Sequence, residues 1–361
     1  MNKRAILLNG LSILAVIVNH TTSWSFTAMF WWTDQYRSVI VPNFDEVGTF
    51  HYYVLLVLRQ LPVFAVPAFI FTSGFFISYV ARGKQSTLSW KVVVARISNL
   101  LIPYTIWIVI IVIGDILQSD VHTLETYILE RGYYFVPLMC QFYLLSPLLI
   151  PLAKNKPRLV LWVAGLLQWG TIGLWYASLV WKVPVLELAT RVTPHWLFFR
   201  WGFYFTCGLA MGLHLRDVSQ WLTAHKKALL IAVIVLGLLS ILGPELLYRT
   251  TGTEWRSSSL NITTSLYAFV FILYFLAVDI PDWLSKLLRY FSGKTYGIYL
   301  THDHVMEFVA RVIRQLAPWI LARQLLFFAP LVFAFGLGMP LLLMAAVRKS
   351  PLRKVYRYLF G

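Results

Sequence analysis

The chain has 361 residues, of which 59% are hydrophobic and 13% are charged. About a quarter of the residues in a soluble domain are charged, so this composition excludes an ordinary soluble protein and favours a membrane protein. The net charge of +16 does not indicate a nucleic-acid-binding protein, because the basic residues are scattered among apolar segments. We therefore expect the lipid bilayer, and not nucleic acid, as a partner.

Apolar segments long enough to cross a bilayer recur along the whole chain. A membrane-spanning helix needs about 20 apolar residues. Ten segments meet this requirement, namely 5–26, 54–80, 92–114, 134–153, 158–180, 196–215, 227–248, 261–279, 294–313 and 324–347. The ninth segment is the least apolar, and Pro62 and Pro67 predict a kink or a separate half-helix in the second. The expected fold class is all-α, a single polytopic membrane helical bundle over residues 1–361 with about ten transmembrane helices.

The charges between these segments predict how the chain is oriented. Basic residues are concentrated in the segments on the side of the N-terminus, and most acidic residues lie in the segments on the other side. Lysine and arginine accumulate in cytoplasmic loops, so both termini are expected in the cytoplasm and the protein in the cell membrane. The first apolar run resembles a signal peptide, but no small-residue cleavage site follows His20, so we interpret it as a retained span.

The first predicted helix carries a histidine near its far end. Asn9 and His20 are eleven residues apart, which at about 100° per residue places them on nearly the same face, roughly 16 Å apart. A titratable side chain within a membrane segment is costly unless it has a partner and a use. Neutral imidazole can act as a general base. A structural histidine that is hydrogen-bonded to a neighbouring helix is an equally weighted alternative.

The second predicted span contains small residues. Thr72, Ser73 and Gly74 would allow another helix to approach closely, and for Ser73 we favour this packing role over a functional one.

A group of basic residues surrounds the start of the third span. Arg96 lies at its first turn, and Arg82, Lys84 and Lys91 precede it. Arginine suits bidentate contacts with phosphate, so the group is a candidate site for a phosphorylated donor from the cytoplasm. An equally weighted alternative is that these charges only orient the chain.

The ninth span contains four ionisable residues within six positions, His302, Asp303, His304 and Glu307. Residues two apart on a helix point to different sides, so His302 and His304 do not readily share one ion, and we predict no metal site. Asp303 and Glu307 share a face. Ionisable groups so deep in a span favour a water-filled cavity, with a structural polar cluster as the alternative.

Several stretches, taken in order, are similar to those of one protein family. They are NGLSILAVIVNH, PAFIFTSGFFIS, ARISNLLIPYTIW, YFVPLMCQFYLLSPLLIPL, FFRWGFYFTCGLAMG and GKTYGIYLTHDH. With these pieces the chain resembles, over nearly its whole length, the acyltransferase 3 family of membrane acyltransferases. The resemblance implies transfer of an acyl group, often acetyl or succinyl, from a cytoplasmic donor such as acyl-CoA to a sugar or another cell-surface acceptor. His20, Arg96 and His302 fall on positions of the family pattern.

The chain departs from that pattern at two positions. The family usually has an arginine where this chain has Asn9, and a second basic residue near Asn99. The loss of two cations would weaken a CoA-like donor site, which leaves room for a different donor or an inactive relative.

From these observations we predict a membrane acyltransferase with acyl-CoA as co-substrate and no tightly bound cofactor. The assigned residues are His20, His302 and Asp303 for catalysis, Arg96, Asn9, Arg82 and Lys91 for the donor, and Ser73, His304 and Glu307 for the acceptor or for support. The main rival is an exporter of a carbohydrate or glycolipid that uses the same cavity without chemistry, since buried titratable groups also suit a proton relay. A membrane scaffold or sensor is a third class.

Overall fold

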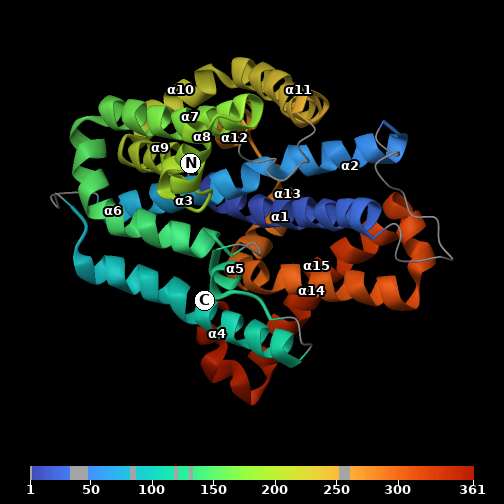
Figure 1. Cartoon of the computed structure of the whole chain (residues 1–361). Helices are drawn as coiled ribbons and strands as arrows, with labels where there is room; N and C mark the ends of the chain where they lie inside the picture. Colours follow the sequence, from blue (N-terminus) through green and yellow to red (C-terminus); the bar gives the residue numbers. More distant parts are fainter. Residues whose placement is uncertain (1, 33–47, 82–86, 118–120, 130–132, 252–260) are drawn as a thin grey trace.

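The computed structural model describes residues 2–32, 48–81, 87–117, 121–129, 133–251 and 261–361 (Figure 1). Within these ranges the regular structure is helical throughout, without a strand, so the all-α prediction is confirmed. The helices of the first half are α1 Asn2–Trp31, α2 Phe50–Gln60, η3 Leu61–Phe64, α3 Ala65–Val80, α4 Trp90–Leu117, α5 Leu124–Leu129, α6 Phe135–Asn155, α7 Pro157–Trp181 and α8 Pro184–Val192.

The second half continues with one more set of helices and short helical turns. They are η4 Phe198–Arg200, α9 Gly202–Leu213, α10 Leu215–Ala224, α11 Lys226–Thr251, α12 Ile262–Ala277, α13 Asp282–Ser292, α14 Thr295–Leu316, η6 Pro318–Ala322, η7 Gln324–Phe328, α15 Ala329–Lys349, η8 Pro351–Val355 and α16 Tyr356–Phe360.

Seven of the helical segments in the described part are long and apolar enough to cross a membrane. They are Asn2–Met29, Phe50–Val80, Trp90–Leu117, Phe135–Asn155, Pro157–Trp181, Lys226–Leu247 and Gln324–Lys349. Two shorter apolar helices, α9 and α12, match the sixth and eighth predicted spans. The ninth predicted span corresponds to α14, which has 22 residues but is more polar than the others. The chain is thus a polytopic membrane bundle in which every predicted span has a helical counterpart.

The second predicted span is interrupted at Pro62, as expected, whereas Pro67 lies in the first turn of α3. Helix α2 ends at Gln60, and a short 3-10 turn that contains Pro62 joins it to α3. Proline has no backbone N–H to donate and its ring crowds the preceding turn, so a continuous α-helix is not maintained there.

The sixth predicted span, 196–215, begins later than the sequence suggests. Residues before Gly202 form turns and the short η4, and side-chain amides hold this irregular backbone. Gln141 of α6 accepts from the Phe198 N–H at 3.1 Å and donates to the Trp196 carbonyl at 3.0 Å, while Gln168 of α7 accepts from the Phe203 N–H at 3.1 Å. Non-helical backbone at membrane depth is tolerated only where such partners satisfy it.

Helix α13 is an amphipathic helix that we did not predict. It packs its apolar side, including the buried Leu288, against α1 at Gly10, where a Cβ atom would lie 1.9 Å from the Leu288 carbonyl oxygen. Lys286 and Arg289 are exposed on the polar side of this helix.

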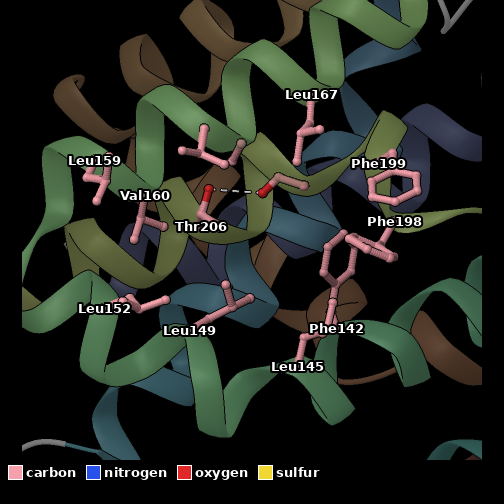
Figure 2. Close-up of a pocket in the computed structure, with 13 residues that line it drawn as sticks. Phe142, Leu145, Leu149, Leu152, Leu159, Val160, Leu167, Phe198, Phe199 and Thr206 are labelled. Atoms are coloured by element: carbon pink, nitrogen blue, oxygen red, sulfur yellow. Dashed lines mark hydrogen bonds between the residues drawn. The ribbon is translucent and has the colours of Figure 1, made fainter.

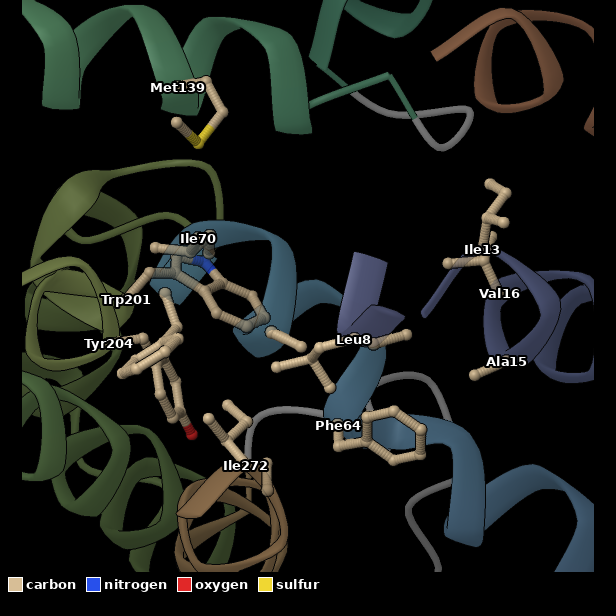
Figure 3. Packing of buried hydrophobic residues seen from close by; sticks show 14 of the residues in the cluster. Leu8, Ile13, Ala15, Val16, Phe64, Ile70, Met139, Trp201, Tyr204 and Ile272 are labelled. Carbon is tan, nitrogen blue, oxygen red and sulfur yellow. The ribbon is translucent and has the colours of Figure 1, made fainter. Parts of the chain in front are cut away.

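Helix α1 lies in the middle of the bundle, with α7 and α9 on one side and α14 and α15 on the other (Figure 1). It contacts α2, α3, α13, α14 and α15. The main apolar cluster combines side chains from α1, α3, α6, α9 and α12, represented in Figure 3 by Leu8, Ile70, Met139, Tyr204 and Ile272. These contacts with five helices hold α1, and therefore His20, in position.

Helices α3 and α9 also cross closely in this core. A Cβ atom at Gly74 would lie 2.2 Å from the Phe205 carbonyl oxygen, and one at Gly208 would lie 2.0 Å from the Phe71 carbonyl oxygen. Small residues let membrane helices approach in this way, which agrees with the packing role that we favoured for the region around Ser73.

Adding a methyl group at this crossing is expected to destabilise the protein. Gly208→Ala forces the two backbones apart, at a cost of about 1–3 kcal/mol, and should lower the Tm in detergent by several degrees. The matched control is Gly173→Ala in α7, where a Cβ atom would meet no heavy atom within 4 Å and alanine is favoured in the helix by about 0.5–1 kcal/mol. Equal melting temperatures of the two variants would contradict the close crossing of α3 and α9.

Candidate active site

Helices α1 and α14 bring a histidine and a carboxylate together. His20 Nδ1 lies 3.0 Å from Asp303 Oδ1, and the two side chains are 29% and 25% exposed. The two residues are 283 positions apart in the chain. The pair is therefore a product of the fold, and it is open enough for a substrate to reach.

The hydrogen bond determines which ring nitrogen of His20 carries the proton. An ionised carboxylate can only accept, so Nδ1–H donates to Asp303 and the lone pair is on Nε2. Within the described ranges Nε2 has no hydrogen-bond partner, and His20 lines a cavity. A carboxylate thus fixes one nitrogen of a cavity-lining histidine, and the other nitrogen keeps its lone pair. This is the arrangement of a general base.

A second imidazole lies against the first. The ring centroids of His20 and His302 are 4.9 Å apart, with an interplanar angle of 71°. His302 is 2% exposed, and its Nδ1–H is directed at the carbonyls of Ile298 at 3.0 Å and Tyr299 at 2.8 Å. Its Nε2 is buried and has no hydrogen-bond partner in the described part of the chain. The environment of His302 thus suits a neutral ring that packs beside His20.

The cavity beside His20 has a volume of about 110 Å³. Four helices or their flanks line it, with Val16 and His20 from α1, Val66 and Phe69 from α3, Tyr134 and Phe135 from α6, and Thr295, Tyr296 and Tyr299 from α14. Pockets for whole ligands measure about 300–1,000 Å³. This space therefore suits the reacting group of a substrate, with the remainder of the molecule outside it.

Of the donor residues that we predicted, Arg96 and Lys91 lie on α4. Arg96 is half-buried, with its guanidinium carbon 5.8 Å from the centre of the Tyr143 ring. Lys91 is exposed, and Arg82 and Lys84 lie outside the described residues. We call the region where α14 begins, together with Arg96 and Asn99 of α4 and the short α16, the inner end of the bundle.

Asn9 and Ser73 do not line the His20 cavity. Asn9 Oδ1 accepts a hydrogen bond from the Thr72 hydroxyl at 2.5 Å, which joins α1 to α3. Ser73 is half-buried beside Gly74 at the crossing of α3 with α9. The predicted roles of Asn9 in donor binding and of Ser73 in support remain untested.

In the described ranges His304 and Glu307 contact residues other than His20. The His304 ring stacks on Tyr133 at 5.5 Å, and its Nδ1 lies 3.8 Å from Glu307 Oε2. Glu307 also pairs with Arg311 at 2.6 Å. His302 and His304 therefore face different surroundings, as their spacing predicts. Among the residues that the structure describes, no three His, Cys, Asp or Glu side chains are grouped as ligands of a metal ion.

Sequence reasoning missed the aromatic lining of the cavity. Tyr296, Tyr299 and Asp303 are spaced three and four positions apart, which is the repeat of one helix face. That spacing could have indicated a common surface with His20.

A second pocket, of about 200 Å³, lies between α6, α7 and α9 (Figure 2). Leucine, valine and phenylalanine side chains form most of its wall, and its one hydroxyl, that of Thr206, donates to the carbonyls of its own helix at Gly202 and Phe203. It contains no titratable group, and Leu152 and Leu159 at its edge are exposed. It therefore suits an apolar chain and not proton transfer.

Comparison with known proteins also indicates an acyltransferase. A family model described as an acyltransferase domain matches residues 4–347. The chain is 20% identical over 259 residues to proteins of Staphylococcus aureus strains MRSA252, N315 and Mu50 named probable poly-beta-1,6-N-acetyl-D-glucosamine export protein, with 69% of this chain and 71% of each relative covered. No solved structure matches the chain.

Proposed function

The chain belongs to the acyltransferase 3 family, and from this premise we propose that it passes an acyl group from a cytoplasmic acyl-CoA-type thioester to a carbohydrate at the cell surface. The observation that carries the proposal is the 3.0 Å contact between His20 Nδ1 and Asp303 Oδ1 at the cavity. It supplies an oriented base at the place where an acceptor would meet the acyl group.

The proposed reaction begins with proton removal. His20 Nε2 takes the proton from the acceptor hydroxyl or amine, whose oxygen or nitrogen attacks the thioester carbonyl carbon. The new bond to carbon forms, the carbon–sulfur bond breaks, and the proton on Nε2 passes to the leaving thiolate. Asp303 stabilises the transient imidazolium. A variant of this route, in which His20 itself first accepts the acyl group, requires the same nitrogen.

The donor is proposed to enter from the inner end. Arg96 and Lys91 would contact its phosphates, because arginine and lysine bind phosphate through charge-assisted hydrogen bonds. Tyr296 lines the cavity and also donates its hydroxyl to the Leu100 carbonyl of α4 at 2.5 Å. This contact joins the wall of the cavity to the helix that carries Arg96. The orientation with both termini in the cytoplasm of the cell membrane is part of the proposal.

The test is an assay for thioester cleavage. Purified protein is incubated with a series of acyl-CoAs, with and without oligosaccharides of β-1,6-linked N-acetylglucosamine, and the release of free thiol is followed. We expect release that depends on the acceptor, with the acyl group recovered on the sugar by mass spectrometry. The linkage in the product distinguishes O-acylation from N-acylation. Absence of release with every donor would contradict the proposal.

Export is the second candidate, and the names of the Staphylococcus relatives favour it. In sealed vesicles an exporter would move the labelled oligosaccharide across the membrane without modifying it. An acyltransferase would modify the sugar on one side and leave its distribution unchanged.

A further inference from the structure

We infer that Arg357, carried by the C-terminal helix α16, forms part of the site that binds the phosphate groups of the donor. This inference rests on the proposed function and adds to it a residue 258 positions away from its partner on α4.

The C-terminal segment is held firmly against the bundle. Trp107 of α4 donates its indole N–H to the Leu359 carbonyl at 2.8 Å, and Phe360 is 3% exposed. Phe360 packs at Gly297 of α14, where a Cβ atom would lie 3.1 Å from Phe360 Cβ. Helix α16 therefore lies between α4 and the first turn of α14, and its arginine has a fixed place.

Arg357 reaches α4 beside the predicted donor residue. Its Nη2 donates to Asn99 Oδ1 at 2.8 Å. Asn99 lies three positions after Arg96, and residues so spaced are neighbours on one helix face. The contact thus brings a second guanidinium to the face of α4 that carries Arg96.

Both guanidinium groups are available to an anion. Arg357 is exposed, and neither it nor Arg96 forms an ion pair with a carboxylate in the described ranges. A guanidinium has five N–H donors, of which Asn99 engages one on Arg357. Two arginines without carboxylate partners on one face suit a ligand with more than one phosphate, such as the diphosphate of a nucleotide-linked thioester.

Tyr296 connects α4, the helix that carries Arg96, to the wall of the His20 cavity. The Tyr296 hydroxyl donates to the carbonyl of Leu100, the residue that follows Asn99, and the same tyrosine lines the His20 cavity. A donor with its phosphates on Arg96 and Arg357 would therefore have its thioester arm close to the wall of that cavity.

Phosphate at this position could come from the donor or from a phospholipid headgroup, and the test separates the two. Binding of CoA to the purified protein is measured for the wild type, Arg357→Gln and Arg353→Gln, in neutral detergent and in vesicles with anionic lipid. Arg353 is an exposed arginine of the preceding turn η8 and serves as the matched control.

We expect Arg357→Gln to weaken CoA binding by about tenfold or more in neutral detergent, the size of one hydrogen bond to a charged group. Arg353→Gln should bind as the wild type does, and Arg357→Lys should fall between the two. Turnover of an acyl-pantetheine thioester, which has no phosphate, should be the same in all variants, and this equality also shows that each variant is folded.

Unchanged CoA binding by Arg357→Gln, or an effect seen only in anionic vesicles, would overturn the inference, and the second result would assign Arg357 to lipid headgroups. A wild-type protein that binds CoA but transfers no acyl group would contradict the proposed function and leave the binding result for Arg357 intact.

Discussion

Replacing His20 with alanine is expected to reduce acyl transfer by about 10²–10⁴-fold, the usual contribution of a general base. The loss follows because the acceptor would have no group that removes its proton at the cavity. The measurement is acceptor-dependent thiol release by purified protein at saturating acyl-CoA. If the acyl group passes through a covalent intermediate on His20, the loss is complete.

The control for this prediction is His51→Ala. His51 lies at the start of α2 and is exposed, so its removal should leave the rate unchanged. Both variants should reach the membrane in the amount of the wild type and elute from a sizing column as it does. CoA binding should also persist in His20→Ala, because the proposed phosphate contacts, Arg96 and Arg357, lie at the inner end. Transfer by His20→Ala near the wild-type rate would eliminate the proposed role.

The sequence was informative about His20 for a physical reason. Titratable groups are rare in apolar spans, so a single histidine in the first span was conspicuous. The same argument found the group from His302 to Glu307. It could not tell which member meets His20, because neighbouring positions on a helix differ by about 100° and the register between α1 and α14 depends on packing along their whole length.

Contacts between segments far apart explain most of what was missed. Nothing near Asn99 in the chain indicates that Arg357 donates to it. Likewise, the late start of α9 depends on Gln141 and Gln168, two amides on other helices. The number of helical segments could be predicted because it depends only on the length of the apolar runs. The Arg357 contact and the start of α9 depend on residues that are distant in the chain.

The exchange Asp303→Asn is expected to lower the turnover number by about 10²–10⁴-fold while the KM for acyl-CoA stays close to that of the wild type. Asparagine has nearly the size of aspartate, so the packing of α14 on α1 should be retained. The neutral amide stabilises the imidazolium less. If it turns its NH₂ toward Nδ1, it places the proton on Nε2, where His20 can no longer act as a base.

The carboxylate control is Asp279→Asn, which removes an exposed partner of Arg4. Exposed ion pairs contribute about 0–1 kcal/mol to stability, and neither Arg4 nor Asp279 lines the His20 cavity, so turnover should not change.

A double variant decides whether Asp303 acts through His20. If Asp303 only orients the ring and stabilises its protonated form, Asp303→Asn should cause no further loss in a protein that already carries His20→Ala, because the effects of residues that work as a unit are strongly non-additive. Turnover of His20→Ala and of the double variant should then be equal. Full multiplication of the two losses would mean that Asp303 contacts the substrate independently, and the 3.0 Å hydrogen bond to His20 would not be the feature on which transfer depends.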